Sequence, residues 1–179
     1  MNPTSVLSIP GYNGAGPSHW LSQWERQASP KIVRVEQKDW TICDPIKWIE
    51  TLETAVLSCS HAPFFLAHSM GCLTVAKWAA ESKNTVAGAM LVAPPDVDAP
   101  ATVKALQTFR PVPLAALPFP TVVVASSNDP YCSLDRARLF ATEWGADFVN
   151  LGAAGHIETT DGFGEWKKGL ELLNQRLSL

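Results

Sequence analysis

The sequence contains no apolar run long enough to cross a bilayer and no stretch rich in lysine or arginine. The first absence leaves no candidate for a membrane-spanning helix. The second argues against nucleic acid or an anionic membrane as a partner, and the formal net charge of −3 agrees with this. The N-terminus, MNPTSVLSIPGYNG, has neither the basic start nor the long apolar stretch of a signal peptide. We therefore expect a cytoplasmic protein.

The four cysteines, Cys43, Cys59, Cys72 and Cys132, form no CxxC pair and no cluster with histidine at metal-ligand spacing. We therefore expect free thiols, no metal site and no cofactor. Only 17% of the residues are charged and 46% are hydrophobic, which is typical of a compact globular protein. A chain of 179 residues supports one well-buried core, so we expect a single domain over residues 1–179.

Short apolar runs alternate with longer amphipathic segments along the whole chain. They predict strands at 4–9, 31–35, 63–68, 86–93, 121–126 and 147–151, and helices at 17–28, 45–58, 70–82, 134–144 and 164–177. Asp44 and Pro45 are typical of a helix cap and a first helical residue. Alternating strands and helices form βαβ units, so the pattern predicts an α/β fold with a parallel sheet between helices.

One long stretch, residues 94–120, interrupts this alternation and is rich in proline and alanine. It has room for one short helix at about residues 102–109. Long connections in compact domains are usually functional, and covering a binding pocket is one such use. We expect this stretch to be a lid-like insertion.

The chemistry-bearing motif is Ala67-His68-Ser69-Met70-Gly71, between a predicted apolar strand and a predicted helix. This is the context of a nucleophile elbow, where a serine sits on a sharp turn with its hydroxyl pointing out of the sheet. The residues two before and two after the serine pack against neighbouring structure and must be small. Ala67 and Gly71 satisfy this, although glycine is usual at the first position.

A serine nucleophile needs a base, and the base needs a carboxylate that fixes its tautomer. In this fold the chain order is serine, acid, histidine. Asp129 lies three residues after the predicted strand 121–126, and His156 follows the last predicted strand. Carboxyl ends of strands are where open α/β sheets form their sites. We predict a triad of Ser69, Asp129 and His156, with a turn-forming role before proline as the alternative for Asp129.

Two other carboxylates and three other histidines compete for these roles. Asp96 and Asp98 follow the preceding strand and are rival acids. His68 lies inside the elbow and is expected to pack beneath the turn. His61 precedes its strand and His19 lies at a junction between loop and helix, so neither is expected to be the base.

An oxyanion hole needs two backbone N–H donors aimed at the developing negative charge. We expect one from Met70, the residue after the nucleophile. The other should come from the loop at residues 10–14, with Tyr12 favoured and Gly11 or Asn13 as alternatives. For substrate binding we predict Gly11, Trp20 and Tyr131; the aromatic candidates to line a pocket are Tyr12, Trp20, Trp40, Tyr131 and Phe163, although core packing is the commoner role of such residues.

Several segments together resemble a known family. They are IPGYNGAGPSHWLSQWE, AHSMGC, LVAPPD, FRPVPLAALPFPTVVVASSNDPYC and GAAGHIETTDGFGEWKKG. The chain resembles the small serine hydrolases grouped with the retinoblastoma-binding protein and its bacterial YdeN-like relatives. The resemblance implies a minimal α/β-hydrolase fold without a large cap, and a mostly parallel sheet of about six strands in the order 2-1-3-4-5-6. It assigns the same triad, and Ser69 would emerge where the strand order reverses.

These features predict a carboxylesterase-like serine hydrolase that cleaves a small ester through an acyl-enzyme, with a thioester or an amide as alternatives. The expected partner is a small acyl substrate. The Leu-x-Cys-x-Glu motif behind the partnership of the retinoblastoma-binding protein is absent, so no protein partner is inferred. The competing hypotheses are a non-catalytic or weakly catalytic protein-binding module on the same fold, and acyl transfer to an acceptor other than water.

Overall fold

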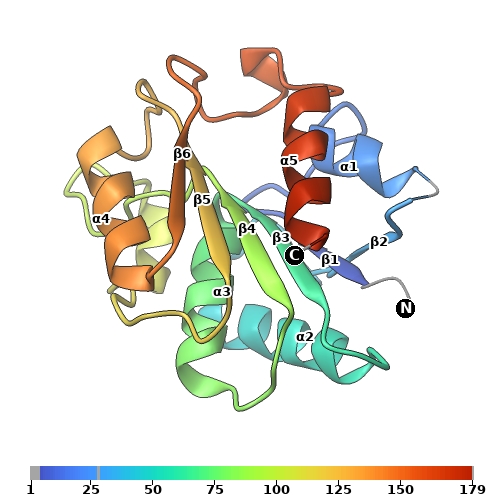
Figure 1. The fold of residues 1–179 in the computed structure, drawn as a ribbon. Coiled ribbons are helices and arrows are strands. Elements are labelled where there is room, and N and C mark those ends of the chain that lie inside the picture. The colour runs from blue at the N-terminus through green and yellow to red at the C-terminus, as the bar shows by residue number, and fades with distance from the viewer. Residues whose placement is uncertain (1–4, 28, 179) are drawn as a thin grey trace.

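Strands and helices alternate along the chain in a computed structural model, which describes residues 5–27 and 29–178 (Figure 1). In chain order the elements are β1 (Val6–Ile9), α1 (Trp20–Glu25), β2 (Ile32–Arg34), α2 (Pro45–Leu57), β3 (Phe64–His68), α3 (Met70–Glu81), β4 (Gly88–Val92), the 3-10 helix η1 (Lys104–Phe109), β5 (Thr121–Ala125), α4 (Leu134–Trp144), β6 (Asp147–Asn150), the 3-10 helix η2 (Thr159–Asp161) and α5 (Lys167–Leu177). Within the described ranges, no helix combines the length and the apolar character that crossing a bilayer requires.

The strands form one six-stranded sheet in the order β2-β1-β3-β4-β5-β6. Every neighbouring pair is parallel. The predicted fold class and strand order are confirmed. From β1 the chain moves to β2 on one side, and from β3 it moves step by step to β6 on the other. The order therefore reverses between β1 and β3, whose carboxyl ends lie side by side, with Ile9 opposite Ala67.

Side chains of the central strands alternate between two cores. On β3, Phe65 and Ala67 belong to a cluster that includes residues of α2, α3 and α4, whereas Phe64 and Leu66 belong to a cluster that includes residues of α1 and α5. Figure 1 shows α1 and α5 together on one face of the sheet. Because β3 is buried on both faces, it reads in the sequence as an uninterrupted apolar run.

The start of α2 matches the prediction, whereas α1 differs from it. The helix α2 begins at Pro45, and the Asp44 carboxylate accepts hydrogen bonds from two N–H groups of its first turn. The helix α1 is shorter than the predicted 17–28 at both ends. It begins after His19, whose Nδ1 accepts the N–H of Leu21 at 3.2 Å, and it ends at Glu25. Residues 4 and 28, at the ends of the predicted strand 4–9 and of this helix, lie outside the described residues, as do 1–3 and 179.

Two further helices differ from the prediction. The helix α5 begins at residue 167 instead of 164, because Trp166 has a left-handed φ of 35° that α-helical backbone does not adopt. In the stretch 94–120 the predicted helix 102–109 is the 3-10 helix η1. The side chains of Leu106 and Phe109 from this segment are buried in the cluster with α2, α3 and α4. The segment is thereby anchored to the domain, and its use as a lid stays a prediction.

Gly71 in the first turn of α3 lies against β1, and a Cβ there would be 1.9 Å from the carbonyl oxygen of Ile9. We predict that Gly71→Ala lowers the free energy of unfolding by about 3 kcal/mol or more, measured by urea denaturation. The control is Gly16→Ala, where a Cβ would meet no atom within 4 Å. That variant should change stability by less than about 1 kcal/mol. Equal effects of the two substitutions would contradict the close contact.

Candidate active site

Ser69 occupies the sharp turn between β3 and α3. Its backbone has φ 55° and ψ −125°, a conformation that is strained for a residue with a side chain. The N–H of Ser69 donates to the carbonyl oxygen of Val92 at 2.9 Å. On the other side, a Cβ at Gly11 would lie only 2.8 Å from the Cβ of Ser69. The turn is therefore held between the strands that flank β3, at the carboxyl end of the sheet.

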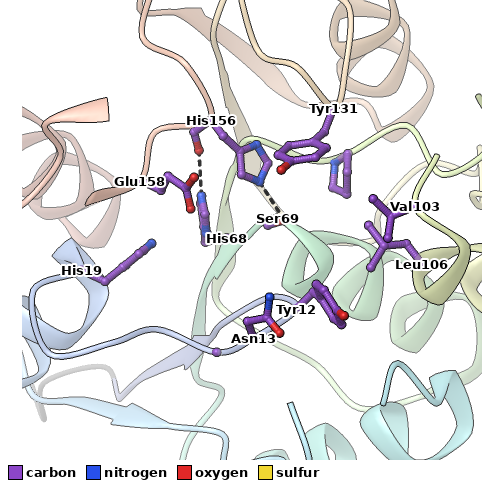
Figure 2. A pocket seen from close by; sticks show the side chains of 12 residues that line it. Tyr12, Asn13, His19, His68, Ser69, Val103, Leu106, Tyr131, His156 and Glu158 are labelled. Atoms are coloured by element: carbon purple, nitrogen blue, oxygen red, sulfur yellow. Dashed lines mark hydrogen bonds between the residues drawn. The ribbon is translucent and has the colours of Figure 1, made fainter. Parts of the chain in front are cut away.

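The side chains of Ser69, His156 and Asp129 form a connected hydrogen-bond chain. The Ser69 hydroxyl donates to His156 Nε2 at 2.9 Å, and His156 Nδ1 donates to the Asp129 oxygens at 2.9 and 3.0 Å. Figure 2 shows the contact between Ser69 and His156. The side chains of His156 and Asp129 are only 7% and 3% exposed. A hydroxyl is thus paired with an imidazole that a carboxylate orients, which is the arrangement nucleophilic catalysis requires.

The loop that carries His156 is held by polar contacts that the sequence did not reveal, one of which joins it to the loop that carries Asp129. Asn128 Oδ1 accepts the N–H of Gly155 at 2.7 Å, and Asp161 Oδ2 accepts the N–H of His156 at 2.8 Å. Gly155 has a φ of +58°, and a Cβ there would lie 2.0 Å from Asp161 Oδ1. The position of Asn128 beside the predicted acid was a usable signal, whereas nothing in the sequence pointed to Asp161.

The two rival acids lie in a different network. Asp96 contacts Arg136 Nε at 3.2 Å, and Asp98 contacts Arg136 Nη2 at 2.8 Å. In the described part of the chain, neither carboxylate has a hydrogen bond with a histidine. The acid that contacts His156 is Asp129.

His68 lies beneath the elbow, as expected, and connects β3 to the loop that carries His156. It is buried, and its Nε2 donates to the backbone carbonyl oxygen of His156 at 2.9 Å (Figure 2). Its ring centroid lies 5.0 Å from that of His156 and 4.8 Å from that of His19. Burial, with smaller contributions from these two rings, lowers the pKa of His68 well below its usual value. The ring is therefore neutral.

The candidate oxyanion donors come from the two predicted segments. Met70 is the first residue of α3, and an N–H at that position has no partner within its helix. In the loop after β1, the N–H of Asn13 donates to the carbonyl oxygen of Trp40 at 2.9 Å, so it is already used. Tyr12 and Gly11 remain from the predicted set. This loop packs directly on the elbow, because a Cβ at Gly11 would lie 2.8 Å from the Met70 nitrogen.

A cavity of about 180 Å³ opens at Ser69. It is smaller than the roughly 300–1,000 Å³ of pockets for drug-sized ligands. Its lining consists of Tyr12, Asn13, Gly14, His19, His68, Ser69, Pro95, Val103, Leu106, Tyr131, His156 and Glu158. None of these described lining residues is lysine or arginine. A second cavity of about 160 Å³ shares four of them, Pro95, Val103, Leu106 and Tyr131.

Of the predicted substrate-binding residues, only Tyr131 lines the cavity, with its ring 4.6 Å from that of His156. Gly11 instead packs against the elbow, close to Ser69 and Met70. The prediction for Trp20 is wrong. Its side chain is completely buried in the cluster with α1 and α5, where Nε1 donates to the carbonyl oxygen of Ile157 at 2.9 Å.

Other pocket predictions divide in the same way. Tyr12 lines the cavity, whereas Trp40 and Phe163 pack against the two core clusters. The lining residues that sequence reasoning missed are Asn13, Gly14, Pro95, Val103, Leu106, Glu158, and the histidines His19 and His68, for which only packing or junction positions were expected. Their signal was weak, because only the folded chain brings the lid-like segment next to the histidine loop.

Residues 6–175 match the serine hydrolase family. The chain belongs to this family. Among solved structures it is similar to a YdeN-like hydrolase from Pectobacterium atrosepticum, at 31% identity and a TM-score of 0.87, with 98% of this chain and 90% of that chain covered. The resemblance to YdeN-like hydrolases is confirmed.

More distant structures share the fold. The ydeN gene product of B. subtilis is 17% identical with a TM-score of 0.79, covering 98% of this chain and 100% of that one. The monoacylglycerol lipase of Paleococcus ferrophilus is 12% identical with a TM-score of 0.74, covering 97% and 94%. No protein with a curated description matches the sequence.

The burial of His19 predicts a pH dependence of stability. Burial, followed by the charge of Arg34 and then by His156, lowers the pKa of His19 from 6.5 to about 4. Between these values the unfolded chain binds a proton that the folded protein does not, so the free energy of unfolding falls as the pH decreases from 6.5 to 4. This one group should contribute about 3 kcal/mol to the fall. Urea denaturation at pH 7 and pH 4 measures it.

The control is His19→Asn, which keeps a side-chain acceptor at the start of α1 but does not titrate. Its stability should fall less between pH 7 and pH 4 than that of the wild type. An equal fall in both proteins would contradict the lowered pKa.

Proposed function

We propose that this serine hydrolase is an esterase in which Ser69 is the nucleophile, His156 the general base and Asp129 the group that orients it. One observation carries the proposal. The Ser69 hydroxyl lies 2.9 Å from Nε2 of His156, and the other ring nitrogen, Nδ1, contacts both oxygens of the buried Asp129 carboxylate. Membership of the serine hydrolase family supports hydrolysis as the reaction class.

In the proposed reaction the Ser69 oxygen attacks the ester carbonyl carbon while its proton passes to His156 Nε2. The carbon–oxygen bond to the leaving group then breaks, and the leaving oxygen takes this proton from His156. Water attacks the resulting acyl-enzyme with His156 again accepting a proton, which returns to Ser69 as the acid is released. The N–H groups of Met70 and Tyr12 are our candidates to stabilise the negative oxygen at each attack.

The cavity supports a small substrate with an apolar acyl group. Figure 2 shows Val103 and Leu106 on one side of Ser69, and His19 and Glu158 on the other. We assign the acyl group to the side of Val103 and Leu106, because their side chains offer only apolar contact. A thioester or an amide could be attacked in the same way, so both belong in a substrate panel beside oxygen esters.

One prediction from this proposal concerns the triad. Ser69→Ala should abolish labelling by a fluorophosphonate probe and ester hydrolysis, since the attacking oxygen is gone. Asp129→Asn should lower kcat on the order of 10⁴-fold, because the amide does not hold the required histidine tautomer. The matched controls Asp96→Asn and Asp98→Asn should lose less than about tenfold. Peptide mapping of the labelled protein and steady-state kinetics measure these effects.

Two results would contradict the proposal. If folded wild-type protein is not labelled at Ser69, the rival hypothesis of a non-catalytic binding module gains support. If Asp96→Asn loses as much activity as Asp129→Asn, the orienting acid is not Asp129.

Another prediction from this proposal concerns the acyl chain length of the preferred ester. With a cavity of about 180 Å³, kcat/KM should be highest for acyl groups of about two to four carbons. The side chain of Leu106 lines both cavities, so Leu106→Ala should join them and shift the optimum to longer chains. Leu114→Ala is the control, because this exposed residue of the same segment lines neither cavity. An unchanged chain-length profile in Leu106→Ala would contradict the assignment of the acyl site.

A further inference from the structure

One polar atom beside the cavity has no hydrogen-bond partner among residues 5–27 and 29–178. It is Nε2 of His19, a residue that is 6% exposed and lines the cavity at Ser69. Buried polar atoms in native proteins are almost always paired, and an unpaired one destabilises the fold. The rest of this ring is accounted for, because Nδ1 caps α1. The orphaned nitrogen therefore requires a separate explanation.

The chemistry of this atom follows from its ring partner. Nδ1 of His19 accepts the N–H of Leu21 at 3.2 Å, so Nδ1 carries no hydrogen. Burial keeps the ring neutral at ordinary pH by lowering its pKa to about 4. A neutral imidazole has a single N–H, which must then be on Nε2. His19 thus presents a hydrogen-bond donor without an acceptor.

The donor lies at a defined end of the cleft. In Figure 2 the His19 ring points toward Glu158 and His68, on the side of Ser69 away from Val103 and Leu106. We call the side with His19 and Glu158 the polar end. His68 is no acceptor for His19, because its own Nε2 donates to a backbone carbonyl. Glu158 Oε1 accepts the hydroxyl of Thr160 at 3.0 Å, and neither carboxylate oxygen of Glu158 forms a hydrogen bond with His19 Nε2.

We propose that the Nε2–H of His19 donates a hydrogen bond to an oxygen atom in the leaving group of the substrate, and that the enzyme selects esters whose alcohol carries such an oxygen. This inference rests on the proposed esterase function. With the acyl group among apolar side chains, the alcohol portion extends toward the polar end. The acceptor is a neutral ether or hydroxyl oxygen, because Glu158 is the only aspartate, glutamate, lysine or arginine among the described residues that line this end, and its carboxylate repels an anion.

A pair of substrates of equal size tests the proposal: 2-methoxyethyl butyrate and n-butyl butyrate, which differ by one oxygen in place of a methylene group. The quantity measured is the ratio of their kcat/KM values. Changes in this ratio between variants report the contact alone, because the intrinsic reactivity of each ester is the same for every variant. Titration of the released acid gives both values.

Two substitutions of His19 separate its two nitrogens. His19→Asn keeps an acceptor for the N–H of Leu21 but has no atom at the position of Nε2, so the ratio should fall about fivefold, the worth of one neutral hydrogen bond. His19→Gln can place an amide N–H near the position of Nε2, so it should retain more of the preference than His19→Asn even though the helix cap is lost. A role of His19 in helix capping alone predicts the opposite order, with His19→Gln the more affected.

Three outcomes would overturn the proposal. The first is an unchanged ratio in His19→Asn that still hydrolyses both esters. The second is an effect confined to esters with the oxygen on the acyl side, such as n-butyl methoxyacetate. The third is a wild type that neither hydrolyses the two esters nor reacts with a fluorophosphonate. That result would refute the proposed esterase function as well as the contact.

A spectroscopic measurement keeps the proposal testable if the His19 variants do not fold. The Ser69→Ala protein, which should bind esters without cleaving them, can be titrated with each ester while the ring ¹H–¹⁵N signal of His19 is followed by NMR. The signal should shift with 2-methoxyethyl butyrate and stay in place with n-butyl butyrate. Equal shifts, or no shift with either, would contradict a hydrogen bond from Nε2.

Discussion

The strained backbone at Ser69 is the constraint on which the site depends. A non-glycine residue at φ 55° and ψ −125° is disfavoured by roughly 1–3 kcal/mol, and the surrounding structure must over-determine it. Three close contacts do so. Gly71 packs on the Ile9 carbonyl, Gly11 packs on the Ser69 side chain, and the Ser69 N–H is bonded to Val92. These neighbours belong to β1, to the loop that follows it, to β4 and to the first turn of α3, so the two strands beside β3 hold the turn in place.

The same rigidity extends to His156 through His68, the residue before Ser69. His68 is part of β3, and its Nε2 holds the backbone carbonyl of His156. Asp161 accepts a hydrogen bond from the backbone N–H of His156. The backbone of His156 is thus fixed at both polar groups, and its side chain needs only the Asp129 carboxylate to set the ring. The distance between the Ser69 and His156 side chains is therefore set by the hydrogen-bonded backbone at both residues.

Sequence reasoning reached the parts of this arrangement that depend on chain order. The buried strands are long apolar runs, and the residues after β3, β5 and β6 must meet at one edge of a parallel sheet. It failed where a side chain has two equally good environments. A tryptophan such as Trp20 has the same sequence pattern whether it lines a pocket or packs in a core. Asp96 and Asp98 form ion pairs with Arg136, a residue of α4 that is distant in the sequence. The start of α1 was missed because histidine is an uncommon cap, and His19 fills that role.

The three neighbouring imidazoles show how burial can assign different roles to one residue type. His19 and His68 are both held neutral because burial lowers their pKa values, and each is fixed by a hydrogen bond to backbone. In the proposed reaction His156 becomes an imidazolium ion, with the His68 ring 5.0 Å away. A second positive charge at that distance would oppose proton transfer from Ser69. Neutral neighbours avoid this, and they leave the N–H of His19 as a donor that does not compete for the Asp129 carboxylate.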